Sequence, residues 1–116
     1  MTYQLDINDR AWFAIKQKTK RIEIRATTNK DKIDYSKLKK EDIIIFSNSK
    51  KEKMSCKIKD INWYDSIEKL LTLEGTKYTL SSTDDYDAGI KSINSIKGYQ
   101  EAIEKFGVYA IHLELC

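Results

Sequence analysis

The sequence predicts an α+β domain in which a small, partly open barrel of curved mixed or antiparallel sheet is flanked by helices. Three observations lead to this fold class. Several short segments alternate apolar and polar residues, as half-buried strands do. Other segments, near the start and the end of the 116-residue chain, carry helical periodicity. The strand-like segments are joined by turns and irregular loops rather than by regular crossover helices, which favours α+β over α/β.

Length and composition indicate one folded domain spanning residues 1–116. Hydrophobic residues make up 41% of the chain and recur along all of it, so the high charge does not indicate disorder. No apolar run approaches the ~20 residues that span a membrane, and the N-terminus lacks the apolar core of a signal peptide. We therefore expect a cytoplasmic protein with no membrane partner. Two cysteines and one histidine predict no disulfide framework, metal site or cofactor.

The first half of the chain predicts one helix followed by three strands. Residues 8–18 carry apolar side chains at helical spacing, whereas residues 21–25 alternate in the manner of a strand. The polar stretch 27–36 predicts a loop. Residues 42–48 contain four consecutive apolar residues, which predict a strand buried on both faces. A third strand begins at Met54.

Two local signals refine these elements. Asn8 or Asp9 can cap the first helix, because either side chain can accept a hydrogen bond from a backbone N–H of the first turn. In the third strand, the face that carries apolar residues up to Ile58 is not the face that carries Ile61. A bulge near Lys59–Asp60 would account for this change of face.

The second half of the chain predicts helices and a final strand. Asp65 and Glu68 have the spacing of a capping box, which predicts a short helix after the third strand. Residues 76–97 permit one helix, which Gly89 would weaken. Residues 108–115 alternate again and predict the last strand.

An apolar stripe at spacing i, i+3, i+4 and i+7 predicts a further helix just before that last strand. The stripe consists of Tyr99, Ala102, Ile103 and Phe106. Such a stripe indicates a buried helix face, and Gly107 is a typical helix end.

Positive charge is concentrated in the first half of the chain. Residues 1–60 hold 16 basic and 9 acidic groups, whereas residues 61–116 hold 5 and 9, within a net charge of +3. One surface is therefore expected to be positive, which suits a polyanion such as RNA. A lysine-rich solvated surface without such a partner is the alternative interpretation.

The segment after the first helix carries a recognisable pattern. Residues 15–25 read IKQKTKRIEIR, which resembles the Ile-Lys-x-Gly-x-Lys-x-x-Glu-x-Arg signature at the start of ASCH (activating signal cointegrator homology) domains. Lys20, Glu23 and Arg25 match the charged positions of this signature. Lys18 stands where the family usually has glycine.

Two further segments follow in the order expected of this family. Residues 38–46, LKKEDIIIF, are similar to its Val-Gly-Asp-x-Ile-x-Phe segment, with Glu41 in place of the glycine. Residues 99–115 resemble its usual ending, a Tyr-led helix that passes through Tyr-Gly-Val into the last strand, with Phe106 replacing the second tyrosine. The resemblance implies a PUA-like β-barrel with a cleft beside the first strand. It also implies binding of RNA or nucleotides, and some family members are enzymes.

The matched residues have the chemistry of a polar cleft. Glu23 and Arg25 lie two apart on a strand, so Arg25 can keep the carboxylate ionised and able to accept a hydrogen bond from a base. Lys20 and Arg21 would supply positive charge to a phosphate. Lys20 has the opposite strand parity, so it reaches the same cleft only if the strand begins after it. Tyr99, which matches the family's tyrosine, is the aromatic residue best placed to stack on a base.

Three functions remain open at this point. The first is a binding module for RNA or a nucleotide, with a cleft lined by Lys, Glu and Arg. The second is a small hydrolase acting on RNA or a modified nucleoside through the same cleft. One amidohydrolase resembles the segment but has threonine at the position of Glu23, and a carboxylate does not simply replace a hydroxyl nucleophile. The third is an interaction domain whose charges form solvated ion pairs worth ~0–1 kcal/mol each.

Overall fold

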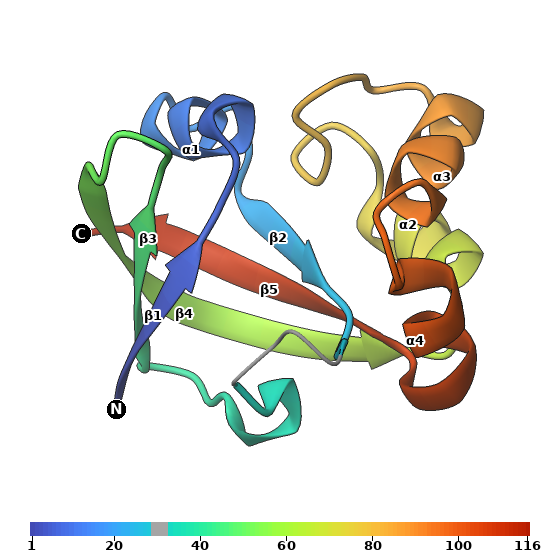
Figure 1. Ribbon diagram of the computed structural model, residues 1–116, viewed down its shortest axis with the longest axis horizontal. Helices are drawn as coiled ribbons and strands as arrows, with labels where there is room; N and C mark the ends of the chain where they lie inside the picture. Colours follow the sequence, from blue (N-terminus) through green and yellow to red (C-terminus); the bar gives the residue numbers. More distant parts are fainter. Residues whose placement is uncertain (29–32) are drawn as a thin grey trace.

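The computed structural model describes residues 1–28 and 33–116, and this part of the chain forms five strands and four α-helices (Figure 1). Their bounds are β1 (Thr2–Asp6), α1 (Asp9–Lys16), β2 (Ile22–Arg25), β3 (Ile43–Ser47), β4 (Lys53–Tyr64), α2 (Ile67–Glu74), α3 (Tyr86–Asn94), α4 (Tyr99–Phe106) and β5 (Val108–Leu115). A 3-10 helix, Tyr35–Lys37, precedes β3. Within the described residues, no helix is long and apolar enough to cross a membrane.

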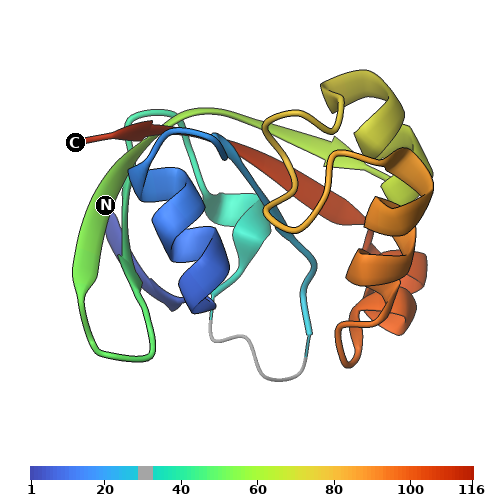
Figure 2. The same ribbon diagram turned by 90° about the horizontal axis from the view of Figure 1, so that it is seen from above.

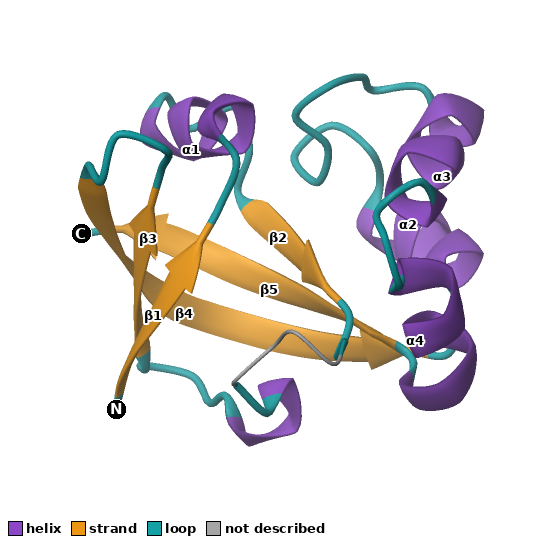
Figure 3. Ribbon diagram, viewed as in Figure 1, coloured by secondary structure: helices purple, strands orange, loops and turns teal. Residues whose placement is uncertain are grey.

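The five strands form one mixed sheet in the order β1-β3-β4-β5-β2. β1 runs parallel to β3, and the other three neighbouring pairs are antiparallel. The sheet curls into a half-barrel with α1 on its concave side, and α2, α3 and α4 gather at one end (Figures 2 and 3). The predicted α+β class with a small curved sheet is therefore confirmed.

The long strand β4 contains the predicted bulge. Its pairing with β5 shifts register between Ile58 and Asp60, so Lys59 has no partner of its own across the ladder. Ile58 pairs with Leu113, and Asp60 pairs with His112. One extra residue turns the later side chains of the strand to the other face, which explains the change of face seen in the sequence.

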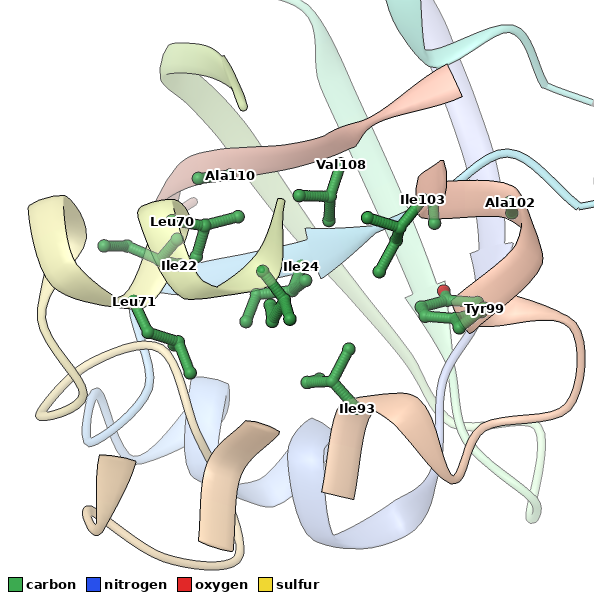
Figure 4. Close-up of a cluster of buried hydrophobic side chains, with 12 residues drawn as sticks. Ile22, Ile24, Leu70, Leu71, Ile93, Tyr99, Ala102, Ile103, Val108 and Ala110 are labelled. Atoms are coloured by element: carbon green, nitrogen blue, oxygen red, sulfur yellow. The ribbon is translucent and has the colours of Figure 1, made fainter. Parts of the chain in front are cut away.

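The first hydrophobic cluster joins α2, α3 and α4 to β2 and β5 (Figure 4). Ile22 and Ile24 of β2 are only 6% and 5% exposed, which confirms that they face the core. Leu70 of α2 and Val108 of β5 are completely buried beside them. This packing fixes the position of β2 against the helical end of the molecule. It therefore also fixes the position of the side chains on the opposite face of β2.

The second hydrophobic cluster packs α1 against β3 and β4. Trp12 and Ile15 of α1 are buried with Ile44 and Phe46 of β3. The Trp12 indole donates a hydrogen bond from Nε1 to the Phe46 carbonyl oxygen at 3.1 Å, so its polar edge is satisfied inside the core. Phe13 lies off this face and is 48% exposed. The start of α1 and the turn after it are thereby fixed relative to the sheet.

Two helix starts show where side-chain capping was predicted correctly and where it was not. Asn8 caps α1, since its Oδ1 accepts the N–H of Ala11 at 2.8 Å. The predicted cap at Asp65 is wrong. Ser66 caps α2 by accepting the N–H of Lys69 at 3.2 Å, and Asp65 pairs instead with the Lys69 ammonium group at 3.1 Å. The helix begins one residue later than expected, which puts the serine at the capping position.

Two strands differ from the sequence prediction. β1 was not predicted at all, because its side chains alternate only between exposed and half-buried. It is an edge strand that pairs in parallel with β3, a contact between segments about 40 residues apart that no local pattern indicates. β3 was predicted to be buried on both faces, but Ile43 and Ile45 stay half-buried. Only the face of β3 toward α1 is fully buried, as is usual for a sheet with one solvated side.

Two other predicted features need correction. Phe106 was placed on the buried stripe of α4, but it is 57% exposed because the chain turns away at Gly107 before the helix completes another turn. The predicted loop 27–36 overlaps the 3-10 helix, which Asp34 caps by accepting the N–H of Ser36 at 3.0 Å. Residues 29–32 of that predicted loop lie outside the described residues.

Candidate functional site

The turn before β2 delivers Lys20 to the site. The Lys20 N–H reaches back to the Ala14 carbonyl oxygen at 3.1 Å. Lys18 turns the chain with a φ of 67°, in the left-handed region. β2 begins only at Ile22, so Lys20 lies before the strand and the alternation of strand side chains does not fix the direction of its own. The sequence predicted that Lys20 reaches the cleft only if the strand begins after it. This is the case, and the Lys20 side chain reaches Glu23.

The Glu23 carboxylate lies between two cations, the buried Lys20 and the mostly buried Arg25. Its Oε2 accepts a hydrogen bond from Arg25 Nε at 2.9 Å and lies 2.8 Å from Arg25 Nη2. Its Oε1 lies 3.4 Å from Lys20 Nζ. Glu23 and Lys20 are only 6% and 4% exposed. The predicted fork of Arg25 on Glu23 is confirmed, and we refer to Lys20, Glu23 and Arg25 as the triad.

The two cations of the triad also bind backbone from other parts of the chain. Lys20 Nζ donates to the carbonyl oxygens of Ile22 at 2.7 Å and Thr79 at 2.5 Å. These bonds, with the contact to the carboxylate, engage all three ammonium hydrogens. Arg25 Nη2 donates to the Asp6 carbonyl oxygen at 3.0 Å, whereas Arg25 Nη1 makes no hydrogen bond to any described residue. The triad thus ties β2 to β1 and to the loop after α2.

Burial and charge act against each other on the pKa values of the triad. Burial alone would raise the pKa of the Glu23 carboxyl, but the charges of Arg25 and Lys20 outweigh it and hold this pKa below its ordinary value. For Lys20, burial prevails over the attraction of Glu23 and lowers the pKa of the ammonium group. Burial opposes the charged form of Arg25, yet the Glu23 carboxylate raises the guanidinium pKa. Glu23 is therefore ionised near neutral pH.

The triad lines a cavity of about 410 Å³ bounded by β2, α1, α3 and the loop between α2 and α3. Four of the five predicted site residues line it, namely Lys20, Glu23, Arg25 and Tyr99. Tyr99 is 9% exposed and also belongs to the first hydrophobic cluster, so it is both core and cavity wall. A cavity of this volume is within the range that small-molecule ligands occupy in proteins.

Arg21 does not join the other four predicted residues. Its side chain lies on the outside, where Nε donates to the Lys18 carbonyl oxygen at 3.2 Å. Its guanidinium carbon lies 4.3 Å from the centre of the Tyr78 ring. The side chain of Lys20, the preceding residue, turns inward, so the turn separates two adjacent basic residues onto different surfaces.

The sequence reasoning missed much of the polar lining of the cavity. These residues include Arg10, Ser81, Ser82, Ser92 and Ser95. Arg10 is exposed on the first turn of α1 and makes no hydrogen bond or ion pair within the described residues. Ser92 and Ser95 lie three residues apart near the end of α3, so helical spacing was the one local signal that could have paired them.

His112 lies outside the cavity and has a carboxylate partner. Its Nε2 is 2.8 Å from Oε1 of Glu74, whose Oε2 accepts hydrogen bonds from Tyr64 at 2.5 Å and from Asn62 at 2.9 Å. Burial and the bond to Glu74 raise the pKa of Tyr64 to about 12. This network joins β4, α2 and β5, and it satisfies the His112 ring at Nε2.

The fold and the site define a small α+β half-barrel with a polar cavity over a buried ion-pair triad. Two solved structures share this fold along nearly the whole chain. The crystal structure of hypothetical protein PH0355 is 28% identical, with all of both chains covered and a TM-score of 0.84. The solution NMR structure of protein PF0455 from Pyrococcus furiosus is 26% identical, covering 99% of this chain and 97% of that one, with a TM-score of 0.75. No family model and no curated protein matches the sequence.

Proposed function

We propose that the chain is an RNA- or nucleotide-binding module of the ASCH type, with a PUA-like fold and its binding site in the cavity over the triad. The observation that carries the proposal is that four of the predicted site residues line the same cavity. Lys20, Glu23, Arg25 and Tyr99 were selected from a sequence pattern, and all four line one cavity of about 410 Å³. That volume suits a nucleotide or a base with its ribose.

The two positions at which the chain departs from the family's glycines support the resemblance. Lys18 and Glu41 occupy those positions and have φ values of 67° and 77°. Lys51 is the one other non-glycine residue with positive φ in the described part of the chain. Glycine is the usual residue for such a backbone. The chain therefore keeps the backbone shape that glycines at these two positions would favour, although the residues differ.

The polar groups around the cavity suit a nucleotide. Arg25 engages Glu23 and the Asp6 carbonyl oxygen through Nε and Nη2, and its side chain adds positive charge to the cavity lining. Arg10 at the rim can contact a phosphate. The hydroxyl groups of Ser82 and Ser92 can donate to or accept from a base edge or a ribose. Positive charge, hydroxyls and an aromatic wall are thus combined in one cavity.

A hydrolase using the same cavity is the alternative function. Glu23 would be its general base, but both carboxylate oxygens already have cationic partners and the carboxyl pKa is held low. Such a group accepts a proton poorly at neutral pH. Lys20 is likewise engaged through all its N–H groups. These interactions favour binding over catalysis.

The substitution Arg10→Gln tests the proposed site without disturbing the fold, because Arg10 is exposed and has no partner within the described residues. We expect its affinity for a short labelled oligouridylate to fall about fivefold, the effect of removing ~1 kcal/mol of charge–charge attraction. Fluorescence anisotropy at low salt measures this change. The control Lys91→Gln removes the same charge from α3 outside the cavity and should change affinity less than about twofold.

Two results would contradict the proposal. One is a wild-type protein that binds neither oligouridylate nor nucleoside monophosphates at low salt. The other is an Arg10→Gln variant that binds RNA as tightly as the wild type. The same preparations should be incubated with acetylated cytidine and with unlabelled RNA, because wild-type turnover of either substrate would favour the hydrolase instead.

A further inference from the structure

A second, smaller cavity lies on the other side of the turn between α1 and β2. Its volume is about 230 Å³, and four basic residues line it, namely Lys18, Lys20, Arg21 and Lys59. Ile15 contributes an apolar part of the wall. Lys20 lines both cavities, so the two are separated only by this turn. Arg21, the predicted site residue that misses the first cavity, thus lies in the second.

Arg21 is held in place by two interactions that leave its outer edge unused. Its Nε donates to the Lys18 carbonyl oxygen at 3.2 Å, and its guanidinium carbon lies 4.3 Å from the centre of the Tyr78 ring. Lys77 Nζ lies 5.2 Å from the centre of the same ring and adds positive charge nearby. The two terminal amino groups of Arg21 have no partner within residues 1–28 and 33–116. An arginine held in this way presents a fork of donors that matches a phosphate group.

Lys18 lines the same cavity from a strained backbone position. Its φ of 67° is one that a residue with a β-carbon adopts at a steric cost. Its N–H still donates to the Ile15 carbonyl oxygen at 3.0 Å, so the turn is properly formed. Glycine would take this backbone conformation without strain. A lysine that keeps this strained conformation and lines a basic cavity indicates that its positive charge has a role in binding.

Lys59 reaches the cavity because it is the extra residue of the bulge in β4. A bulge re-aims the side chain that it adds, here toward the turn that carries Lys18 and Arg21. Glu114 is the carboxylate that lines this cavity, and it lies 3.9 Å from the ammonium group of Lys57. Lys20 pairs with Glu23, but Lys18, Arg21 and Lys59 form no ion pair with any described residue. The cavity therefore carries excess positive charge.

We propose that Lys18, Arg21 and Lys59 form a phosphate-binding site for the RNA backbone, next to the nucleotide held in the first cavity. The inference rests on the proposed function, since it assigns the RNA backbone that continues from that nucleotide to this second site. Three cations around one cavity match a phosphodiester better than a base or a sugar. Lys20 lines both cavities, so an RNA chain that crosses the turn can place a nucleotide in the first cavity and a backbone phosphate in the second.

The substitution Lys18→Gly gives a sharp test, because it removes the charge and relieves the backbone strain at the same time. Any loss of RNA affinity then occurs in a protein that is folded at least as well as the wild type, which its melting temperature confirms. With a short oligouridylate, the slope of log affinity against log salt should fall by about 0.7 for each phosphate that the variant no longer neutralises. Lys59→Gln should lower the slope similarly, while Lys91→Gln on α3 should leave it unchanged.

A titration with inorganic phosphate, followed by NMR on ¹⁵N-labelled protein, separates this site from the first one. We expect saturable shifts of the Arg21 Nε–H signal and the Lys18 amide signal, with binding several-fold weaker in Lys59→Gln. Intact RNA binding with unchanged salt slopes in Lys18→Gly and Lys59→Gln would overturn the second site and leave the first. Phosphate shifts at Arg21 without any oligouridylate binding would overturn the RNA function and, with it, the assignment of this site to the RNA backbone.

Discussion

Glu23 is the residue on which the candidate site depends, because its carboxylate is the counter-charge for both Lys20 and Arg25. The alternation from Arg21 to Arg25 predicted that Glu23 and Arg25 would meet on one strand face. It did not predict that Lys20 is buried, since a partner that stabilises Lys20 is the Thr79 carbonyl oxygen, far along the chain. A solvated strand face with ordinary ion pairs was the other interpretation, and the 6% exposure of Glu23 excludes it.

The substitution Glu23→Gln should lower the free energy of unfolding by about 3–5 kcal/mol, because an amide leaves the buried Lys20 and the mostly buried Arg25 without a counter-charge. Urea denaturation monitored by tryptophan fluorescence measures this loss. The matched control is Glu104→Gln on the exposed face of α4, which should change stability by less than about 0.5 kcal/mol. A loss in Glu23→Gln as small as in the control would show that the triad is not a buried ion-pair cluster.

Acid should destabilise the protein partly through Glu23. The pKa of this carboxyl is lower in the folded state than its ordinary value of 4.5. As the pH falls, the unfolded state therefore takes up the proton first. The stabilisation is present above pH 4.5 and is lost as the pH falls from there through the folded-state pKa. Glu74 shows a shift in the same direction, so the useful quantity is the difference between wild type and Glu23→Gln. Equal pH dependence of the two proteins below pH 5 would contradict this assignment.

At the scale of elements, two turns carry side chains where the backbone favours glycine. Lys18 follows the end of α1 with a φ of 67°, and Glu41 precedes β3 with a φ of 77°. Both turns are hydrogen-bonded, since the Lys18 N–H donates to Ile15 at 3.0 Å and the Glu41 N–H donates to Ile58 at 2.9 Å. The tertiary structure thus imposes a conformation that these residues do not favour, and the strain remains in the folded state.

The substitutions Lys18→Gly and Glu41→Gly should each raise the free energy of unfolding by about 0.5–1 kcal/mol. Relief of the left-handed backbone strain stabilises the folded state by ~1–2 kcal/mol. The greater conformational freedom of glycine in the unfolded chain offsets part of this stabilisation. Thermal denaturation followed by circular dichroism measures the change. Lys50→Gly is the matched control, because Lys50 lacks a positive φ and its replacement should destabilise. Destabilisation of all three variants by the same amount would mean that the two turns are not strained.

At the scale of the whole molecule, sequence patterns predicted what depends on local periodicity. The bulge near Lys59 followed from a change of face within one strand, and the end of α4 followed from Gly107. β1 was missed because its place depends on parallel pairing with β3, which is a non-local interaction. The serine-rich wall of the cavity was missed because the loop after α2 is positioned by bonds from β2, such as Ile22 N–H to the Tyr78 carbonyl oxygen at 3.0 Å. Local alternation therefore indicated the Glu23–Arg25 pair, the resemblance indicated Lys20 and a cleft beside this strand, and neither indicated the serine residues of the cavity wall.

The most direct test of the central claim, that the cavity over the triad binds RNA or a nucleotide, is an NMR titration of ¹⁵N-labelled protein with a short oligouridylate at low salt. We predict that the largest shifts occur at the Arg25 Nε–H group and at the backbone amides of Ser82 and Ser92, all of which line the cavity. These shifts should saturate and should weaken as salt is added. Saturating RNA that leaves these three signals unmoved, or that shifts only signals on the exposed face of α4, would contradict the account.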